Sequence, residues 1–324
     1  MIVTVTANPS VDRTIVLPGE LVRGSVIRAA DARVEPGGKG VNVSRAVQMA
    51  GAATTAILPA RSGDPLLVGL DAVGLVHRTV DVAVDVRSNL TITEPDGTTT
   101  KLNLPGAVMS PAELAEMTRL VLDSASTATW VALCGSLPPG VPDDWYADLA
   151  DQLSSMPCRV AVDTSGTPLT AVRAAMPAVS VDLIKPNSEE LCEITGADLA
   201  ALEQAADAGD FGPTHDAARA LHDLAGCAVL ATLGAAGAML VTETGAWRAT
   251  PPPMIPVSTV GAGDATLAGY LLATLDDAAP ADALRRAVAY GSAAAGLAGT
   301  QPPRPTDLAL SAVRVSEVAT PHAV

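Results

Sequence analysis

Short segments rich in β-branched residues alternate with Ala- and Leu-rich segments along most of the 324-residue chain. The predicted strands are Ile2–Thr6, Thr54–Leu58, Trp130–Cys134, Arg159–Asp163, Leu183–Lys185, Ala228–Thr232 and Ala238–Val241. The predicted helices are Gly40–Ala50, Pro111–Ser124, Asp143–Leu153, Thr167–Ala175, Ser188–Thr195, His215–Leu224, Ala265–Leu275 and Asp282–Gly296. Strands that alternate with crossover helices form a mainly parallel sheet with helices on both faces. The sequence therefore predicts a doubly wound α/β fold.

Two segments, residues 10–34 and 81–104, break this alternation because they are rich in β-formers and lack a crossover helix. Within the second, Arg87–Glu94 and Thr98–Leu104 flank Pro95-Asp96-Gly97, a sequence typical of a hairpin turn. We predict that both segments form a small sheet, the lid, inserted in a single domain spanning residues 1–324. The proline-rich end of the chain, from Gln301 onward, is expected to add one short helix at most.

Composition excludes several classes of protein. The formal net charge of -15 argues against nucleic acid or an anionic membrane as a partner. Aromatic residues make up only 2% of the chain, so the core must consist mainly of Ala, Val and Leu. The four cysteines lack the C-x-x-C spacing of metal sites and are expected to be reduced thiols of a cytoplasmic protein. No apolar run reaches the ~18 residues that predict a membrane span.

The segment Val260-Gly261-Ala262-Gly263-Asp264 is a small-residue turn that leads into an apolar helix. Its glycines let the backbone approach a ligand closely, and the start of the helix presents free amides and a positive dipole to an anion such as phosphate. Asp264 is a carboxylate beside this anion site. It either complements the helix start or accepts a proton next to a developing phosphoryl charge, and this segment alone leaves both roles open.

A second glycine-rich turn, Gly37-Gly38-Lys39-Gly40-Val41-Asn42, also precedes a helix. Lys39 offers an ammonium group, and Asn42 offers both a donor and an acceptor. The segment lacks the spacing and the Lys-Ser/Thr ending of a Walker A loop. It either forms part of a ligand site or leaves Lys39 as an exposed turn residue.

Other polar residues follow predicted strands, where ligands bind in doubly wound sheets. Asp12 comes soon after the first strand and suits a ligand's hydroxyl groups, unless it only closes an Asx turn. Gly135-Ser136-Leu137-Pro138-Pro139-Gly140 is a stiff loop directly after another strand. Thr232–Gly237 either lines a nucleotide or is only a hairpin turn.

Two further pairs suit anionic ligands or metal ions. Asn187 and Glu190 lie one helical turn apart and either bind Mg²⁺ through water or form a capping box. Arg87 and Asn89 share one face of a lid strand. Arg87 either binds an anionic substrate or is an ordinary surface arginine.

Together, five segments in this order resemble the PfkB (ribokinase-like) family of carbohydrate kinases over nearly the whole chain. They are Asn8-Pro9-Ser10-Val11-Asp12, Gly37–Asn42, Gly135–Gly140, Lys185-Pro186-Asn187-Ser188-Glu189-Glu190 and Val260–Asp264. The Gly-Gly-Lys-Gly form with Arg87-Ser88-Asn89 is similar to the branch that phosphorylates sugar phosphates, the 1-phosphofructokinase and tagatose-6-phosphate kinase group. Minor 6-phosphofructokinases usually carry a different residue where Lys39 stands. Ile27, Ser88 and the segment Leu58–Asp64 depart from the family pattern.

The resemblance implies a role for each matching residue. Asp264 would be the catalytic base, beside an anion hole made by Gly261, Ala262 and Gly263. The sugar phosphate would be held by Asp12, Gly38, Asn42 and Ser136, and its existing phosphate by Lys39, Arg87, Asn89 and Arg28. ATP would face Lys185, Asn187, Thr232, Gly234, Gly237 and Ser292, while Asn187 and Glu190 would organise Mg²⁺ through water.

The resemblance implies an ATP-dependent sugar-phosphate kinase with fructose 1-phosphate as the favoured acceptor. Tagatose 6-phosphate is the near alternative, and a non-catalytic sugar-phosphate sensor is the alternative of a different class. Because a projecting sheet exposes unpaired edges, the lid is expected to pair with the lid of a second copy in a homodimer. The alternative is a monomer whose lid packs only on its own domain.

Overall fold

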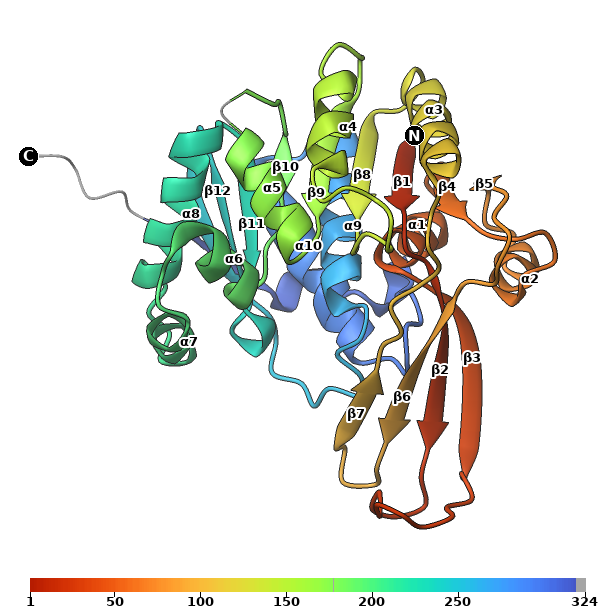
Figure 1. Ribbon diagram of the computed structural model, residues 1–324. Coiled ribbons are helices and arrows are strands. Elements are labelled where there is room, and N and C mark those ends of the chain that lie inside the picture. Colours follow the sequence, from red (N-terminus) through yellow and green to blue (C-terminus); the bar gives the residue numbers. More distant parts are fainter. Residues whose placement is uncertain (177, 319–324) are drawn as a thin grey trace, which may run out of the picture.

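The computed structural model describes residues 1–176 and 178–318, and it is built around a ten-stranded sheet (Figure 1). In spatial order the strands are β14 (Arg314–Glu317), β13 (Gly245–Thr250), β12 (Ala238–Thr242), β11 (Ala228–Thr232), β10 (Leu183–Ile184), β9 (Arg159–Asp163), β8 (Trp130–Cys134), β1 (Ile2–Thr6), β4 (Thr54–Pro59) and β5 (His77–Val80). Neighbours from β11 to β5 are parallel, whereas β11 to β14 are antiparallel. The predicted mainly parallel sheet is confirmed.

Helices cover both faces of this sheet, as predicted (Figure 1). One face packs on α1 (Lys39–Met49), α9 (Ala262–Leu275) and α10 (Pro280–Ala295). The other packs on α3 (Pro111–Ala125), α4 (Trp145–Leu153), α5 (Thr167–Ala175), α6 (Ser188–Thr195), α7 (Leu199–Asp207) and α8 (Gly212–Ala225). Alternate strand residues enter the two layers, so that Ile2 packs with the first group and Val3 with the second. Both layers are filled mainly by Ala, Val and Leu.

The lid is a four-stranded sheet that projects from the main domain (Figure 1). Its strand order is β3 (Asp31–Gly37), β2 (Ser10–Val16), β6 (Arg87–Thr93) and β7 (Thr99–Leu102). The central pair β2 and β6 is parallel, and the outer pairs are antiparallel. Because β3 ends at Gly37, the lid runs directly into the second glycine-rich turn and the start of α1.

The structure corrects several predicted elements. The structure contains α2 (Pro65–Ala72), β5, α7, β13 and β14, which were not predicted. The Pro-rich end contributes β14, which pairs with the exposed edge of β13, rather than a short α-helix. Helix α9 begins at Ala262 instead of Ala265, because Gly261 adopts a left-handed φ of 78° and caps the helix three residues earlier. None of the described helices is long and apolar enough to cross a membrane.

Candidate active site

The glycine turn before α9 places Asp264 in the first turn of that helix, where backbone amides lack helical partners. The residue is 6% exposed, and its Oδ2 accepts a hydrogen bond of 2.9 Å from Asn42 Nδ2. Burial, reinforced by the nearby charge of Asp163, raises the pKa of Asp264 to about 6, although Lys39, Asn42 and Lys185 act in the opposite direction. A carboxylate with such a pKa is well suited to accept a proton near neutral pH.

Asp163, at the carboxyl end of β9, lies between two lysines. Its Oδ1 is 2.8 Å from Lys39 Nζ, and its Oδ2 is 3.2 Å from Lys185 Nζ. Although burial alone would raise it, the pKa of Asp163 is held below its usual value by these two ammonium groups. A side chain added at Gly263 would contact Lys185 Nζ, so this cationic group faces the anion turn. The Lys39–Asp163–Lys185 group therefore places the Lys185 ammonium beside the turn.

Asp163 was not among the predicted site residues. A signal was present, because Asp163-Thr164-Ser165-Gly166 directly follows a predicted strand, where the other polar site residues were found. The structure also gives different partners to Lys39 and Arg87, which were both predicted to bind the existing phosphate. Lys39 lies with Asp163 and, at 3.8 Å, Glu190, whereas Arg87 bonds to the backbone oxygens of Asn8 and Leu104.

The lid contributes polar side chains from adjacent strands. Asp12 and Asn89 are register partners on β2 and β6, and Asn89 Nδ2 donates to Asp12 Oδ1 over 3.1 Å. Because Asp12 pairs in the sheet, it is not merely part of an Asx turn. Burial raises the pKa of Asp12 and lowers the pKa of Arg87. Both charged groups thus carry a desolvation cost. The hydroxyl groups of a ligand would offset it at Asp12, and an anionic group of the ligand would offset it at Arg87.

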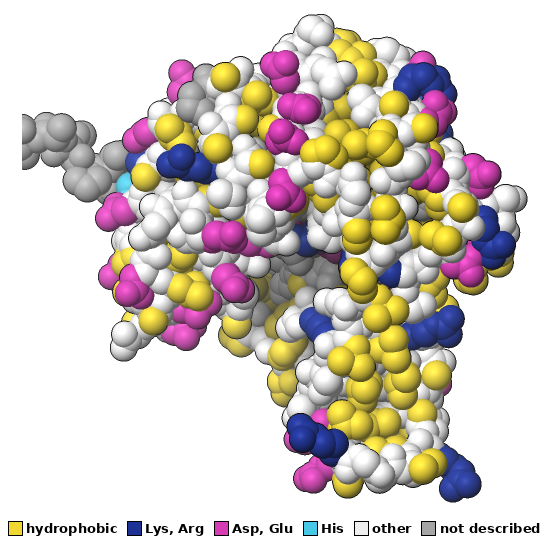
Figure 2. Space-filling model, viewed as in Figure 1, with side chains coloured by type: hydrophobic (Ala, Val, Ile, Leu, Met, Phe, Trp, Pro, Cys, Tyr) yellow, Lys and Arg dark blue, Asp and Glu magenta, His cyan; other side chains and the backbone are white. Residues whose placement is uncertain are grey.

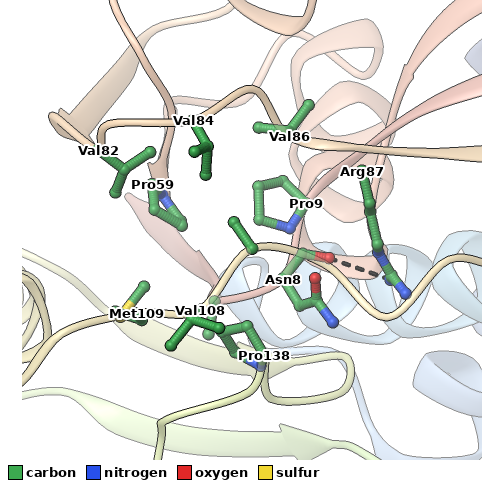
Figure 3. A pocket seen from close by; sticks show the side chains of 12 residues that line it. Asn8, Pro9, Pro59, Val82, Val84, Val86, Arg87, Val108, Met109 and Pro138 are labelled. Atoms are coloured by element: carbon green, nitrogen blue, oxygen red, sulfur yellow. Dashed lines mark hydrogen bonds between the residues drawn. The ribbon is translucent and has the colours of Figure 1, made fainter.

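Asn42 Oδ1, Asn89 Oδ1 and Arg87 Nε are among the buried polar atoms that have no hydrogen-bond partner in the described residues. Unpaired buried polar groups are costly unless a ligand or water satisfies them. Asn8 connects this region to the stiff loop after β8, because its Nδ2 donates to Ser136 Oγ over 3.3 Å. An apolar pocket adjoins Arg87 and Asn8 and is lined by Val84, Val86 and Pro138, among others (Figure 3).

Asn187 and Glu190 form a complete capping box at the start of α6. Asn187 Oδ1 accepts from the Glu190 amide at 2.8 Å, and Glu190 Oε2 accepts from the Asn187 amide at 2.9 Å. The capping box is therefore formed, and the role of the pair toward Mg²⁺ stays a prediction. Glu190 Oε1 points instead to Lys39 at 3.8 Å, and this oxygen fits a water-mediated Mg²⁺ shell, which needs only one or two carboxylates.

The remaining predicted site residues lie on different elements. Thr232 lies beside Asn187, since its amide donates to the Pro186 carbonyl at 2.9 Å. Gly234 and Gly237 stand in the turn of the antiparallel β11–β12 pair, and their role toward a nucleotide stays a prediction. Ser292 lies on α10 and donates to Met254 Sδ. Arg28 lies apart, exposed in the loop between β2 and β3 at the end of the lid opposite Asp12.

The site combines a buried carboxylate at the start of α9, a glycine turn and the Lys185 ammonium against that turn. A positive helix end and an ammonium group suit the charge of a transferring phosphoryl group. The fold and the site thus define a phosphotransferase that acts on a small hydroxylated molecule.

Comparison with known proteins agrees with this class. The pfkB family carbohydrate kinase profile matches residues 5–307, and the chain belongs to this family. It is 37% identical to a 1-phosphofructokinase of Rhodobacter capsulatus over 97% of this chain and 96% of that protein. A 1-phosphofructokinase of Xanthomonas campestris is 36% identical, with 85% of each chain covered. Phosphofructokinase-2 from Escherichia coli, solved in complex with substrates and products, superposes with a TM-score of 0.85 at 30% identity, covering 94% of this chain and 96% of that one.

Proposed function

We propose that this kinase transfers the γ-phosphoryl group of ATP to fructose 1-phosphate, producing fructose 1,6-bisphosphate and ADP. The observation that carries the proposal is the buried Asp264 carboxylate, held by Asn42 in the first turn of α9. Asp264 takes the proton of the acceptor hydroxyl, and the oxygen formed attacks the γ-phosphorus. The amides of Gly261, Ala262 and Gly263 stabilise the charge on the transferring group.

The acceptor is held from the lid side. Asp12, Gly38 and Asn42 bind the sugar hydroxyls, Arg87 and Asn89 bind the phosphate already present, and Ser136 adjoins them through Asn8. Lys39, which pairs with Asp163, and Arg28, at the far end of the lid, are not assigned to this phosphate. Lys185, Asn187, Thr232, Gly234, Gly237 and Ser292 face ATP. Mg²⁺, held through water by Asn187 and Glu190, would neutralise phosphate charge. The orphaned Arg87 Nε is a donor and supports the phosphate assignment, whereas the orphaned Asn89 Oδ1 is an acceptor that a sugar hydroxyl would satisfy.

Fructose 1-phosphate is favoured by the relatives named 1-phosphofructokinase. It is also favoured by Lys39, because minor 6-phosphofructokinases usually carry a different residue at this position. Escherichia coli phosphofructokinase-2 has been solved with fructose 6-phosphate, so that isomer is a necessary comparison. Tagatose 6-phosphate remains the near alternative. A non-catalytic sensor is disfavoured because it would have no use for a buried carboxylate with a raised pKa.

We also propose a homodimer joined through the lids. Strand pairing places Ile15, Leu90, Ile92, Val34 and Leu102 on one lid face, opposite the face that carries Asp12 and Asn89. Val34 and Leu102 are 57% and 51% exposed, and Figure 2 shows hydrophobic side chains gathered on the lid. A second copy of this face would cover them.

The free thiols of Cys134, Cys158, Cys192 and Cys227 support a reducing compartment, for which we propose the cytoplasm.

The proposed reaction is tested by ADP release, measured with ATP, Mg²⁺ and one of four acceptors. The acceptors are fructose 1-phosphate, fructose 6-phosphate, tagatose 6-phosphate and unphosphorylated fructose. We expect the highest kcat/KM with fructose 1-phosphate and the lowest with fructose. A higher value with another sugar phosphate would reassign the substrate. Calorimetric binding of a sugar phosphate without ADP release from any acceptor would identify a sensor.

A further inference from the structure

Arg45 joins three parts of the site that are distant in sequence. The residue lies on α1, and its guanidinium is almost completely buried, with 8% exposure for the whole residue. Nη1 donates to the carbonyl of Pro36 at 3.2 Å and to the carbonyl and hydroxyl of Thr300 at 3.2 and 3.3 Å. Nη2 donates to Glu35 Oε1 at 3.4 Å. A buried guanidinium requires such partners for its charge and donors.

Glu35 and Thr300 also contact each other directly. The Thr300 amide donates to Glu35 Oε2 over 3.3 Å, although 265 positions separate the two residues. The loop lies flat against the carboxylate, because a side chain at Gly299 would collide with Glu35. We call Glu35, Arg45 and Thr300 the brace. Its three members come from lid strand β3, from α1 and from the loop after α10.

Each member of the brace adjoins a residue of the proposed site. Glu35 is the register partner of Asp12, which faces the acceptor. Thr300 packs against the anion turn, since a side chain at Gly261 would meet the Thr300 Cα at 3.8 Å. Arg45 lies one helical turn after Asn42, which bonds to Asp264. The brace therefore connects the acceptor side of the site, the anion turn and the support of the base.

We propose that Arg45 is a positioning residue that fixes the base of the lid to the anion turn through Glu35 and Thr300. The inference rests on the kinase reaction proposed above. With the brace intact, the acceptor held by the lid lies in line with the phosphoryl group held by the turn. Without it, the two halves move independently, and water competes with the sugar for the phosphoryl group. Misplacement of reacting groups by about 1 Å can cost on the order of 100-fold in rate.

The test uses Arg45→Met and the double variant Glu35→Met/Arg45→Met. The double variant removes both charges together, so that no buried charge is left unpaired if the single variant fails to fold. Two controls match these changes. Arg33→Met makes the same substitution on β3 at an exposed ion pair with Asp31. Leu221→Ala lowers stability at a buried core site of α8, in the layer on the opposite face of the sheet from α1.

The first measurement compares kcat, the KM for each substrate, and the ratio of ADP released to sugar bisphosphate formed. We expect the brace variants to lose at least about 10-fold in kcat, consistent with misplaced reactants. Their ratio of ADP to bisphosphate should rise above the wild-type value, while the KM for ATP changes less than about twofold. Wild-type kcat and ratio in the folded double variant would overturn the proposal. An equal rise of the ratio in Leu221→Ala would also overturn it.

The second measurement, hydrogen–deuterium exchange without ligands, does not depend on the substrate assignment. The brace variants should exchange faster than wild type both at residues 31–38 and at residues 296–301, with α8 unchanged. Unchanged exchange at either segment would overturn the proposal, whatever reaction the protein catalyses. If the wild type releases no ADP with any sugar phosphate, the proposed function fails, and the exchange result alone decides the role of Arg45.

Discussion

Asn42 and Asp264 meet through a single hydrogen bond of 2.9 Å that connects two glycine-rich turns 222 positions apart in sequence. Each residue lies in the first or second turn of the helix that follows its own glycines, α1 or α9. The bond occupies Asp264 Oδ2, and none of the hydrogen bonds in the described residues uses Oδ1. One oxygen of the carboxylate is thus fixed while the other is free to take a proton.

The pH dependence of turnover follows from the pKa of Asp264, about 6. A general base acts only when deprotonated, so kcat should fall as pH decreases through about 6. Lys39 lowers this pKa through its charge, so Lys39→Met should move the acid limb to higher pH. The check is a rate profile from pH 5 to 9 for both proteins. An unmoved or downward-shifted limb in Lys39→Met would contradict this electrostatic assignment.

Arg87→Ala should weaken the binding of the sugar phosphate and leave the KM for ATP nearly unchanged. A charge-assisted hydrogen bond contributes about 1.5–3 kcal/mol, which corresponds to roughly 10- to 150-fold in the KM of the acceptor. The matched control is Arg33→Ala, an exposed lid arginine paired with Asp31. Steady-state kinetics with each substrate varied in turn measure the effect. An acceptor KM that is the same in Arg87→Ala and in the control would place the phosphate elsewhere.

The lid dimer predicts a mass in light scattering of twice the 32.6 kDa chain at micromolar concentration. Leu102→Glu should shift the protein toward monomer, because a charge would be buried in an apolar interface. Leu224→Glu is the control, since Leu224 is 39% exposed on α8, which packs on β11 and β12 of the main sheet. If the wild type is a fully active monomer, the lid dimer is refuted.

Asp264 also has a predicted cost in stability. The folded-state pKa lies above the unfolded value, so ionising Asp264 opposes folding at pH above 6, and this cost disappears below about pH 4. A shift from 3.8 to about 6 corresponds to a free energy on the order of 3 kcal/mol. Asp264→Asn should therefore unfold at a higher temperature than wild type at pH 8, and the difference should shrink as pH falls from 6 to 4. A difference independent of pH would show that the carboxylate is not destabilising.

The local parts of the fold and site could be predicted from the sequence, whereas the pairings between them could not. Gly261 and Gly38 mark helix starts through their neighbours in sequence, so both turns were predicted, apart from the early start of α9. The contact of Lys39 with Asp163 spans 124 positions, and no local pattern indicates which carboxylate a lysine will meet. For the same reason, the brace around Arg45 depends entirely on how the lid, α1 and the loop after α10 pack together.

The central claim is that Asp264 is the base for phosphoryl transfer to fructose 1-phosphate. Its most direct test compares wild type and Asp264→Asn at pH 8, in single-turnover formation of bisphosphate with ATP and Mg²⁺. The Kd of the sugar phosphate is measured in parallel by calorimetry. We predict a rate lower by about 10²–10⁴-fold in the variant, with a Kd within a few-fold of wild type, because Asn keeps the shape but cannot accept the proton. A variant rate within a few-fold of wild type would contradict the account.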